Sequence, residues 1–179
     1  MRSQSFSLSA MMACVSAGLL LAGCTSSTGP PVDDWFNMEM TDVLTGEVFA
    51  VNDFSGKVIL LGTMAQWCPN CLVQQANVRK AYEQLGRPED LILISLDVDV
   101  NEDEASLKAY AEEWGFEWRF AVSPLLVSRA LGNLYTAQYL NPPLDPMMII
   151  DRGGEVHHLP YGRKEADALL RELEPYLAE

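Results

Sequence analysis

The chain combines two unbroken apolar runs with segments whose apolar residues recur at helical spacing. Residues 58–61 and 91–96 are almost entirely apolar, which is typical of strands covered on both faces. Between them, a helical spacing of apolar residues ends at Gly86 and predicts a helix over about 70–85. Its members are Cys71, Val78, Tyr82 and Leu85. A strand, a helix and a strand of these lengths predict a parallel crossover unit, whose helix begins at the carboxyl end of the first strand.

The remaining residues predict further elements around this unit. Apolar and polar residues alternate over 38–54, on both sides of a turn at 45–47, and this pattern predicts a short hairpin. Asn101 and Glu104 form a capping pair for a helix that reaches Trp114. The fold class is therefore α/β, a central mixed sheet flanked by helices, with an N-terminal hairpin and a middle insertion. The other expected elements are a strand over 116–122, a helix over 124–135, a hairpin over 147–159 and an apolar-striped helix over 166–177.

The first 24 residues have the layout of a secretory leader. Arg2 precedes an apolar run over 7–22 that is too short for a membrane span of about 20 residues. The run ends in Leu21-Ala22-Gly23-Cys24, which resembles the lipobox of bacterial lipoproteins. We therefore expect a signal peptide over 1–23, a lipidated Cys24 with a flexible tether over 24–34, and a folded domain over 35–179. The alternative for Cys24 is a spare thiol in an uncleaved anchor.

Length and charge narrow the class of protein. The 179 residues, 49% of them hydrophobic, suffice for one domain with a core and exclude a disordered tail protein. Only 12 Lys and Arg stand against 25 Asp and Glu, a net charge of −13, which excludes a nucleic-acid binder. The same acidity argues against a polybasic attachment to anionic lipid. A membrane tether is then covalent or hydrophobic, as acyl chains on Cys24 would supply.

Cys68 and Cys71 lie three residues apart, where the first buried strand leads into the predicted helix. Unpaired N–H groups and the helix dipole favour an anion at a helix start. We therefore expect a depressed pKa for Cys68 and more of its reactive thiolate. Cys71, one turn further on, is placed to displace a mixed disulfide formed by Cys68. Pro69 suits an early helical position because it needs no N–H there.

Three other readings of the cysteine pair are a structural disulfide, half of a zinc site and two core cysteines. A disulfide that closes so small a loop stabilises a fold only weakly. Zinc normally takes four ligands, and the other candidates, His157 and His158, are adjacent on a strand and point to opposite faces. Redox chemistry is therefore favoured, without a bound metal or cofactor, because the cysteines themselves carry the electrons.

Residues 57–71, which include Trp67-Cys68-Pro69-Asn70-Cys71, resemble the first strand and active site of thioredoxin-fold proteins, especially membrane-anchored thiol:disulfide reductases of the TlpA type. Residues 146–156 are similar to the family's stretch from its cis-proline through the following hairpin. The resemblance implies a thioredoxin-like fold over roughly 35–178, catalytic Cys68 and Cys71, and a cis peptide bond at Pro146 beside Cys68. Pro142 and Pro143 are rivals for that bond. The residues implied to bind substrate are Trp67, which is favoured as a lid although it could also fill the core, Pro69, Asp145 and Pro146.

Two positions depart from the family pattern. Thioredoxins have a buried Asp six residues before the first cysteine, where this chain has Gly62, and many TlpA-type proteins have a Glu where it has Gln74. Both familiar acceptors for the proton of the resolving thiol are thus missing, and Gln74 reads as an ordinary helix-surface residue. We hypothesise that Asp145 lies near the sulfurs and accepts this proton. The alternative is a solvated turn residue before proline.

The densest acidic run covers residues 97–104. A calcium loop would want a glycine at its sharp turn and a bidentate Glu at a fixed spacing, and this run has neither. We expect a solvated strand end that leads into an acid-rich helix start.

Together these features predict a lipid-anchored, extracytoplasmic thiol:disulfide oxidoreductase. Its expected partners are client proteins with cysteines or disulfides and a redox donor or acceptor protein. We expect it to face the periplasm, with the outer membrane favoured because Thr25 follows the lipidated cysteine. The alternatives are a Sco-like copper chaperone, whose cysteines have three intervening residues instead of two, and a redox-inactive thioredoxin-like binding module. A peroxidase is less favoured because a peroxiredoxin would have Thr or Ser at Ala65.

Overall fold

The computed structural model describes residues 32–178. The predicted signal peptide, Cys24 and most of the predicted tether lie outside the described residues. Within the described part, none of the helices combines the length and the apolar character that a membrane crossing needs.

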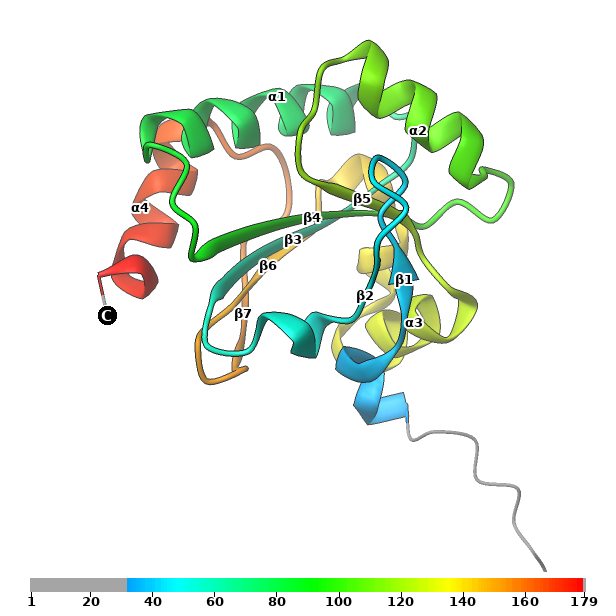
Figure 1. The fold of residues 1–179 in the computed structure, drawn as a ribbon, viewed down its shortest axis with the longest axis horizontal. Helices are drawn as coiled ribbons and strands as arrows, with labels where there is room; N and C mark the ends of the chain where they lie inside the picture. Colours follow the sequence, from blue (N-terminus) through cyan, green and yellow to red (C-terminus); the bar gives the residue numbers. More distant parts are fainter. Residues whose placement is uncertain (1–31, 179) are drawn as a thin grey trace, which may run out of the picture.

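A five-stranded mixed sheet forms the centre of the fold (Figure 1), with the strand order β5-β4-β3-β6-β7. Strands β3, β4 and β5 are parallel, and β6 and β7 add antiparallel pairs. Every residue of β3 and β4 is buried, as their apolar runs predict. The strands are β3 (Val58–Met64), β4 (Leu91–Asp97), β5 (Arg119–Val122), β6 (Met147–Ile150) and β7 (Val156–His158).

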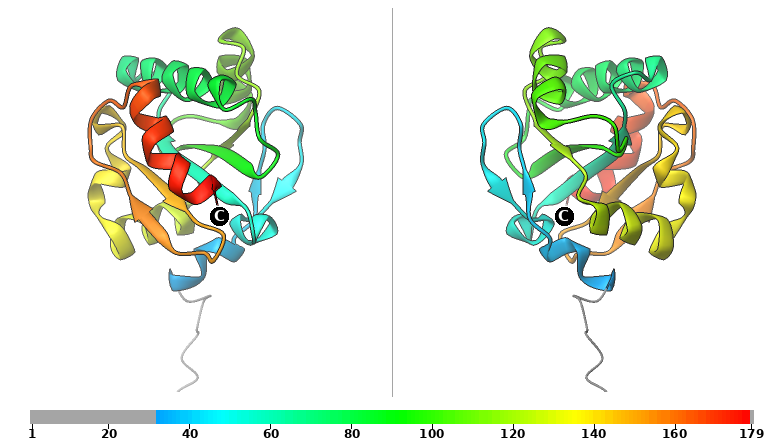
Figure 2. Two further views of the ribbon diagram at one scale, coloured as in Figure 1. Left: turned by 90° about the vertical axis from the view of Figure 1, so that its left-hand side faces the viewer. Right: turned by 90° about the vertical axis from the view of Figure 1, so that its right-hand side faces the viewer.

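Helices cover both faces of this sheet (Figure 2), so the predicted mixed sheet flanked by helices is confirmed. Side chains of a strand alternate between faces: Leu60 joins the core under α1, α2 and α4, whereas Leu61 joins the core under α3 and the N-terminal segment. The helices are α1 (Pro69–Gln84), α2 (Glu104–Glu113), α3 (Leu125–Ala130) and α4 (Ala166–Leu177).

The smaller elements differ in part from expectation. β1 (Met40–Thr41) and β2 (Val48–Phe49) form the predicted hairpin. The helix expected over 124–135 ends at Ala130 and continues as a π-helical turn, Leu131–Tyr135. Gly132 lies in that turn, and glycine weakens a helix. The other short helical segments are Val32–Asn37, Val51–Phe54, Ala137–Leu140 and Pro142–Leu144.

The start of α2 also corrects a prediction. Asp103, and not Asn101, is the N-cap: its carboxylate accepts the Ser106 N–H at 2.8 Å, and the Ser106 hydroxyl accepts the Asp103 N–H at 3.2 Å. Asn101 instead donates its own N–H to Asp99 at 2.9 Å. Both residues are of a type that caps helices, and the turn made by Asp99 decides between them.

Candidate active site

The cysteine pair lies at the junction of β3 and α1. Cys68 is the N-cap residue of α1 and Pro69 occupies its first turn, as predicted. Cys68 and Cys71 are joined in a disulfide, with Cα atoms 5.3 Å apart, and both are buried. The strand-to-helix connection therefore supplies the two sulfurs at the end of the sheet where β3 finishes.

The two sulfur atoms have different neighbours. Cys68 Sγ accepts a hydrogen bond from the Cys71 backbone N–H at 3.1 Å. Cys71 Sγ lies 3.4 Å from the carbonyl oxygen of Pro142. An N–H donor stabilises a thiolate, whereas a carbonyl oxygen can only accept the proton of a neutral thiol. After reduction, these contacts favour the thiolate at Cys68 and the thiol at Cys71.

A small cavity of about 10 Å³ adjoins Cys71 on the inner side of α1. Its walls include Gly62, Thr63, Asp145 and Met147. Thr63 Oγ1 and Asp145 Oδ1 are buried and have no hydrogen-bond partner among the described residues. The space is about that of one water molecule, which such groups would bind. Asp145 and Cys71 therefore face the same small cavity.

Asp145 is a buried residue with strained backbone, and the solvated-turn alternative is wrong. Its side chain is 3% exposed, and its φ of 45° places it in the left-handed region. Its N–H donates to the Pro142 carbonyl at 2.8 Å, and its carbonyl accepts from Lys164 Nζ at 2.6 Å. Burial raises the pKa of the Asp145 carboxyl, and the positive charges of Lys164 and Arg163 oppose that rise.

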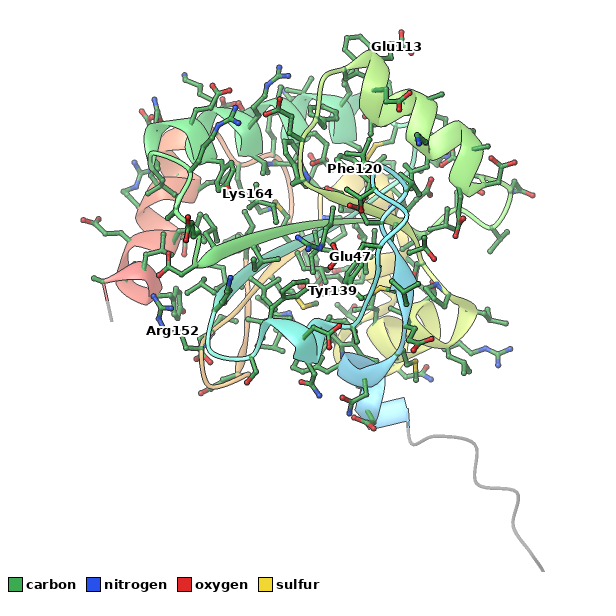
Figure 3. All side chains as sticks on the ribbon, viewed as in Figure 1. Glu47, Glu113, Phe120, Tyr139, Arg152 and Lys164 are labelled. Carbon is green, nitrogen blue, oxygen red and sulfur yellow. A yellow bond between two sulfur atoms is a disulfide. The ribbon has the colours of Figure 1, made fainter. Side chains whose placement is uncertain are left out.

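Lys164 belongs to the site although nothing in the sequence pointed to it. Its side chain lies in the interior between α1 and the sheet (Figure 3) and is 6% exposed. Nζ donates to the carbonyl oxygens of Asp145 and, at 2.7 Å, Gly162. Burial lowers the pKa of Lys164 to about 8. A single lysine in an irregular segment gives no pattern by which a sequence could reveal its burial.

Gln74 is buried as well, so its expected place on the helix surface is wrong. Its Oε1 accepts the Lys164 backbone N–H at 2.7 Å, and its Nε2 donates to the Lys164 carbonyl at 3.2 Å. Gln74 follows Cys71 by three residues and therefore shares its helix face. That spacing is the signal that would have placed it beside the cysteines.

The predicted cis bond at Pro146 is also corrected, because no cis peptide bond occurs among the described residues. The chain turns into β6 at the left-handed Asp145 instead. The Pro146 carbonyl accepts the Thr63 N–H at 3.1 Å, which extends the pairing of β6 with β3. Neither the N–H nor the carbonyl of Asp145 is free to pair with a substrate strand in this state.

The outer rim of the site carries exposed side chains. Trp67 is 56% exposed, so its reading as a core filler is wrong, and its Nε1 donates to Asp99 at 2.6 Å. Pro69 is exposed beside it. Asn70 donates to the Pro143 carbonyl at 3.3 Å and joins the helix start to the segment before β6.

The acidic run after β4 is only partly solvated. Asp97 is fully buried, and this burial, together with the contact to Glu102, raises its pKa to about 7. The expectation of a solvated strand end is therefore wrong at Asp97, which the sequence could not distinguish from the exposed Asp103 and Glu104 of the same run.

The two histidines lie on opposite faces of the sheet, as predicted. His157 Nε2 contacts Asp151 at 2.8 Å, and His158 Nδ1 contacts the Tyr139 hydroxyl at 2.8 Å. Asp151, Glu155 and His157 place their ligand atoms within 4.8 Å of one another, at the end of the sheet opposite the cysteines. Among residues 32–178, no such cluster includes Cys68 or Cys71.

Comparison with known proteins supports the fold. No protein-family profile matches the chain. A segment of 66 residues is 35% identical to the rice protein "Probable nucleoredoxin 3" (Oryza sativa subsp. japonica). That match covers 36% of this chain and only 14% of the rice protein's length.

Solved structures match over most of the chain. A thiol:disulfide interchange protein of the thioredoxin family from Chlorobium tepidum is similar with a TM-score of 0.63 at 17% identity, over 78% of this chain and 92% of that one. The MTB protein dsbF gives 0.63 at 15% identity, over 82% and 98%. A SCO1/SenC family lipoprotein from Bacillus anthracis gives 0.61 at 18% identity, over 79% and 93%. At these identities the matches show the thioredoxin-like fold, which confirms the predicted fold class.

Proposed function

We propose that this chain is a thiol:disulfide oxidoreductase that exchanges disulfides with protein cysteines through Cys68 and Cys71. The observation that carries the proposal is the unequal environment of the two sulfurs: an N–H faces Cys68 and a carbonyl oxygen faces Cys71. A nucleophile needs its thiolate form at neutral pH, and a resolving thiol keeps its proton until the mixed disulfide exists.

In the reducing direction, the Cys68 thiolate attacks one sulfur of a client disulfide. The Cys68–client bond forms, the client S–S bond breaks, and the second client sulfur leaves as a thiolate. Cys71 then loses its proton and attacks Cys68 Sγ, which forms the Cys68–Cys71 bond and releases the first client sulfur. Two electrons pass to the client, and its two thiolates take up protons. The reverse steps oxidise a client dithiol, and the relative reduction potentials set the direction.

Asp145 is the group we assign to accept the Cys71 proton. It lines the same cavity as Cys71, and its free Oδ1 lies in a space that one water molecule would fill. Burial raises the Asp145 pKa, which brings a carboxyl closer to the neutral range in which a general base works best. Lys164 holds the Asp145 carbonyl and so fixes the turn that presents this side chain.

Client binding is assigned to the exposed rim, with Trp67 and Pro69 next to the buried Cys68. The roles of Asp145 and Pro146 in binding a client strand remain predictions. The described contacts do not favour them, because both residues are buried and their backbone groups bond within the protein.

The proposed location is extracytoplasmic, facing the periplasm, with a lipid on Cys24 and the outer membrane favoured. Its support is the apolar run that ends in Leu21-Ala22-Gly23-Cys24, together with Thr25. One of the similar structures is itself described as a lipoprotein. A client with cysteines and a redox donor or acceptor protein are the partners that the proposed reaction requires.

The test uses the 179-residue chain and insulin as the disulfide substrate. Cys68→Ser should abolish insulin reduction, and Cys71→Ser should accumulate a mixed disulfide with the client. Cys24→Ser is the matched control, which should keep insulin reduction and lose partition into the membrane fraction. Full activity in Cys68→Ser would refute the proposal and favour a redox-inactive binding module.

The copper-chaperone alternative requires a different set of residues at the site, because a Sco-like site needs a histidine beside the two thiolates. His157 and His158 are the chain's two histidines, and they bond to Asp151 and Tyr139. Titration of the reduced chain with Cu(I) decides the matter. Tight 1:1 binding that weakens in His157→Ala or His158→Ala would favour the chaperone.

A further inference from the structure

Two carboxyl groups meet at the carboxyl end of β4, beside the active-site turn. Asp97 is the last residue of β4, is fully buried and lies between β3 and β5. Both side chains accept hydrogen bonds from Gln66, and a hydrogen bond with Glu102 helps to raise the pKa of Asp97. Two carboxyl groups form such a bond only when one of them carries a proton.

The pair is bonded directly to the residue that leads into the cysteine motif. Glu102 Oε2 accepts the backbone N–H of Gln66 at 2.8 Å, and Asp97 Oδ2 accepts from Gln66 Nε2 at 3.2 Å. Gln66 lies inside a tight turn, in which the Cys68 N–H donates to the Ala65 carbonyl at 3.2 Å. The pair therefore holds the turn that positions Cys68.

Among residues 32–178, neither carboxyl group has an ion-pair partner. The charge that acts on Asp97 comes from Glu102, and hydrogen bonds from Gln66 and the Asp99 N–H favour its ionised form. The negative charges of both carboxylates act on Tyr110 of α2 and help to raise its pKa. The buried Tyr110 hydroxyl has no hydrogen-bond partner among the described residues. Ser106, also from α2, bonds to Gln66 and carries no charge. Loss of the shared proton would thus place two unneutralised carboxylates in contact.

We propose that Asp97 and Glu102 share one proton, and that this state positions the Gln66–Trp67 segment, and with it the nucleophilic Cys68. When the proton leaves, the half-buried Glu102 turns toward solvent and the Gln66 N–H loses its acceptor. Asp97 and Glu102 are then positioning residues that act on Cys68 through Gln66. The effect on Cys68 rests on the proposed function, whereas the effect on Gln66 does not.

Amide hydrogen exchange of Gln66 tests the first step. It is measured by NMR on the oxidised 179-residue chain in mild detergent, relative to the intrinsic exchange rate. Protection of the Gln66 N–H should fall by about tenfold or more between about pH 5.5 and 8.5, since the loss of one acceptor opens the turn. In Glu102→Gln and in Asp97→Asn the protection of the Gln66 N–H should change by less than about threefold over the same pH range. Each variant keeps only one of the two carboxyl groups and therefore has no shared proton to lose.

Glu104→Gln is the matched control, because it removes the same charge from an exposed position in the first turn of α2. It should behave like the unmodified chain. Constant protection in the unmodified chain, or an equal fall in all four proteins, would overturn the proposal.

The second step is tested on Cys68 itself. In the reduced chain, the rate of Cys68 alkylation as a function of pH should be described by two ionisations, that of the Cys68 thiol and that of the Asp97–Glu102 pair. In Glu102→Gln, the ionisation of Cys68 alone should describe it. A Gln66 effect without any change in this profile would overturn the positioning role. Insulin reduction by Cys68→Ser is measured separately. Full activity in that variant would refute the proposed function, whereas an unchanged alkylation profile would refute only this inference.

Discussion

Lys164 donates a hydrogen bond from its Nζ to the main-chain carbonyl of Asp145 at 2.6 Å. This bond joins the turn before β6 to the segment before α4, two parts of the chain that lie 19 residues apart. Because Asp145 also lines the cavity beside Cys71, the bond places a buried positive charge near the acid that we assign as proton acceptor.

Asp145→Asn should slow the resolution of the mixed disulfide, because the amide cannot accept the Cys71 proton. Loss of a general base costs about 100-fold in rate. Stopped-flow measurement of resolution should show the largest deficit at high pH, where the Asp145 carboxyl of the unmodified protein is ionised. Asp167→Asn, in the first turn of α4, is the control and should be without effect. Equal rates for Asp145→Asn and the unmodified protein would remove Asp145 from the mechanism.

Lys164→Met should destabilise the fold by about 1–3 kcal/mol, because the Asp145 and Gly162 carbonyls lose their donor. The pKa of Lys164 is lowered from 10.5 to about 8, so between these pH values the unfolded chain binds more protons than the native one. Lys164 therefore adds stability as pH rises through that window. Urea unfolding should show a gap between the two proteins that widens with pH. The exposed Lys108→Met should show no such gap.

Asp97→Asn should change the pH dependence of stability in the opposite sense. The pKa of Asp97 rises from 3.8 to about 7 on folding, so the native state binds more protons in that range. The unmodified chain then loses stability as pH increases through this window, and the asparagine variant does not. Relative to the unmodified chain, the variant should gain at least about 1 kcal/mol between pH 4 and pH 8. A constant difference in urea unfolding would contradict the burial of a protonated Asp97.

Trp67→Phe should affect protein substrates and spare small ones. The indole is 56% exposed, so its replacement should change the free energy of unfolding by less than about 0.5 kcal/mol. Loss of the contact surface and of the bond to Asp99 should raise KM for insulin by about threefold, the size expected for one aromatic contact. The rate with a small aromatic disulfide should stay the same. Trp114→Phe, 44% exposed at the end of α2, is the control.

Local patterns in the sequence predicted most of the scaffold. The apolar runs at 58–61 and 91–96 are the buried strands β3 and β4, and the spacing that ends at Gly86 is helix α1. The position of Cys68 before α1 follows from the same short stretch. These features depend on neighbouring residues, and neighbours in sequence are visible without a structure.

Other parts of the site depend on which distant segments meet. Gln74 and Lys164 bond to each other across 90 residues. Asp97 lies between β3 and β5, and its side chain bonds to Gln66, 31 residues earlier in the chain. The identity of a residue as glutamine or aspartate does not reveal whether it lies in solvent or in the interior. Its burial, its partners and its pKa are therefore absent from any local pattern.

The sequence by itself determined the strand-helix-strand unit, the cysteine motif at its turn and the acidity of the chain, since each is a property of residue type and spacing. Only the tertiary structure decided that Asp145 faces Cys71's cavity, that Lys164 holds its turn and that Asp97 and Glu102 meet beside Gln66. The physical reason is that desolvation and hydrogen bonding between distant groups arise when the chain packs, and the same side chains have neither in the unfolded state.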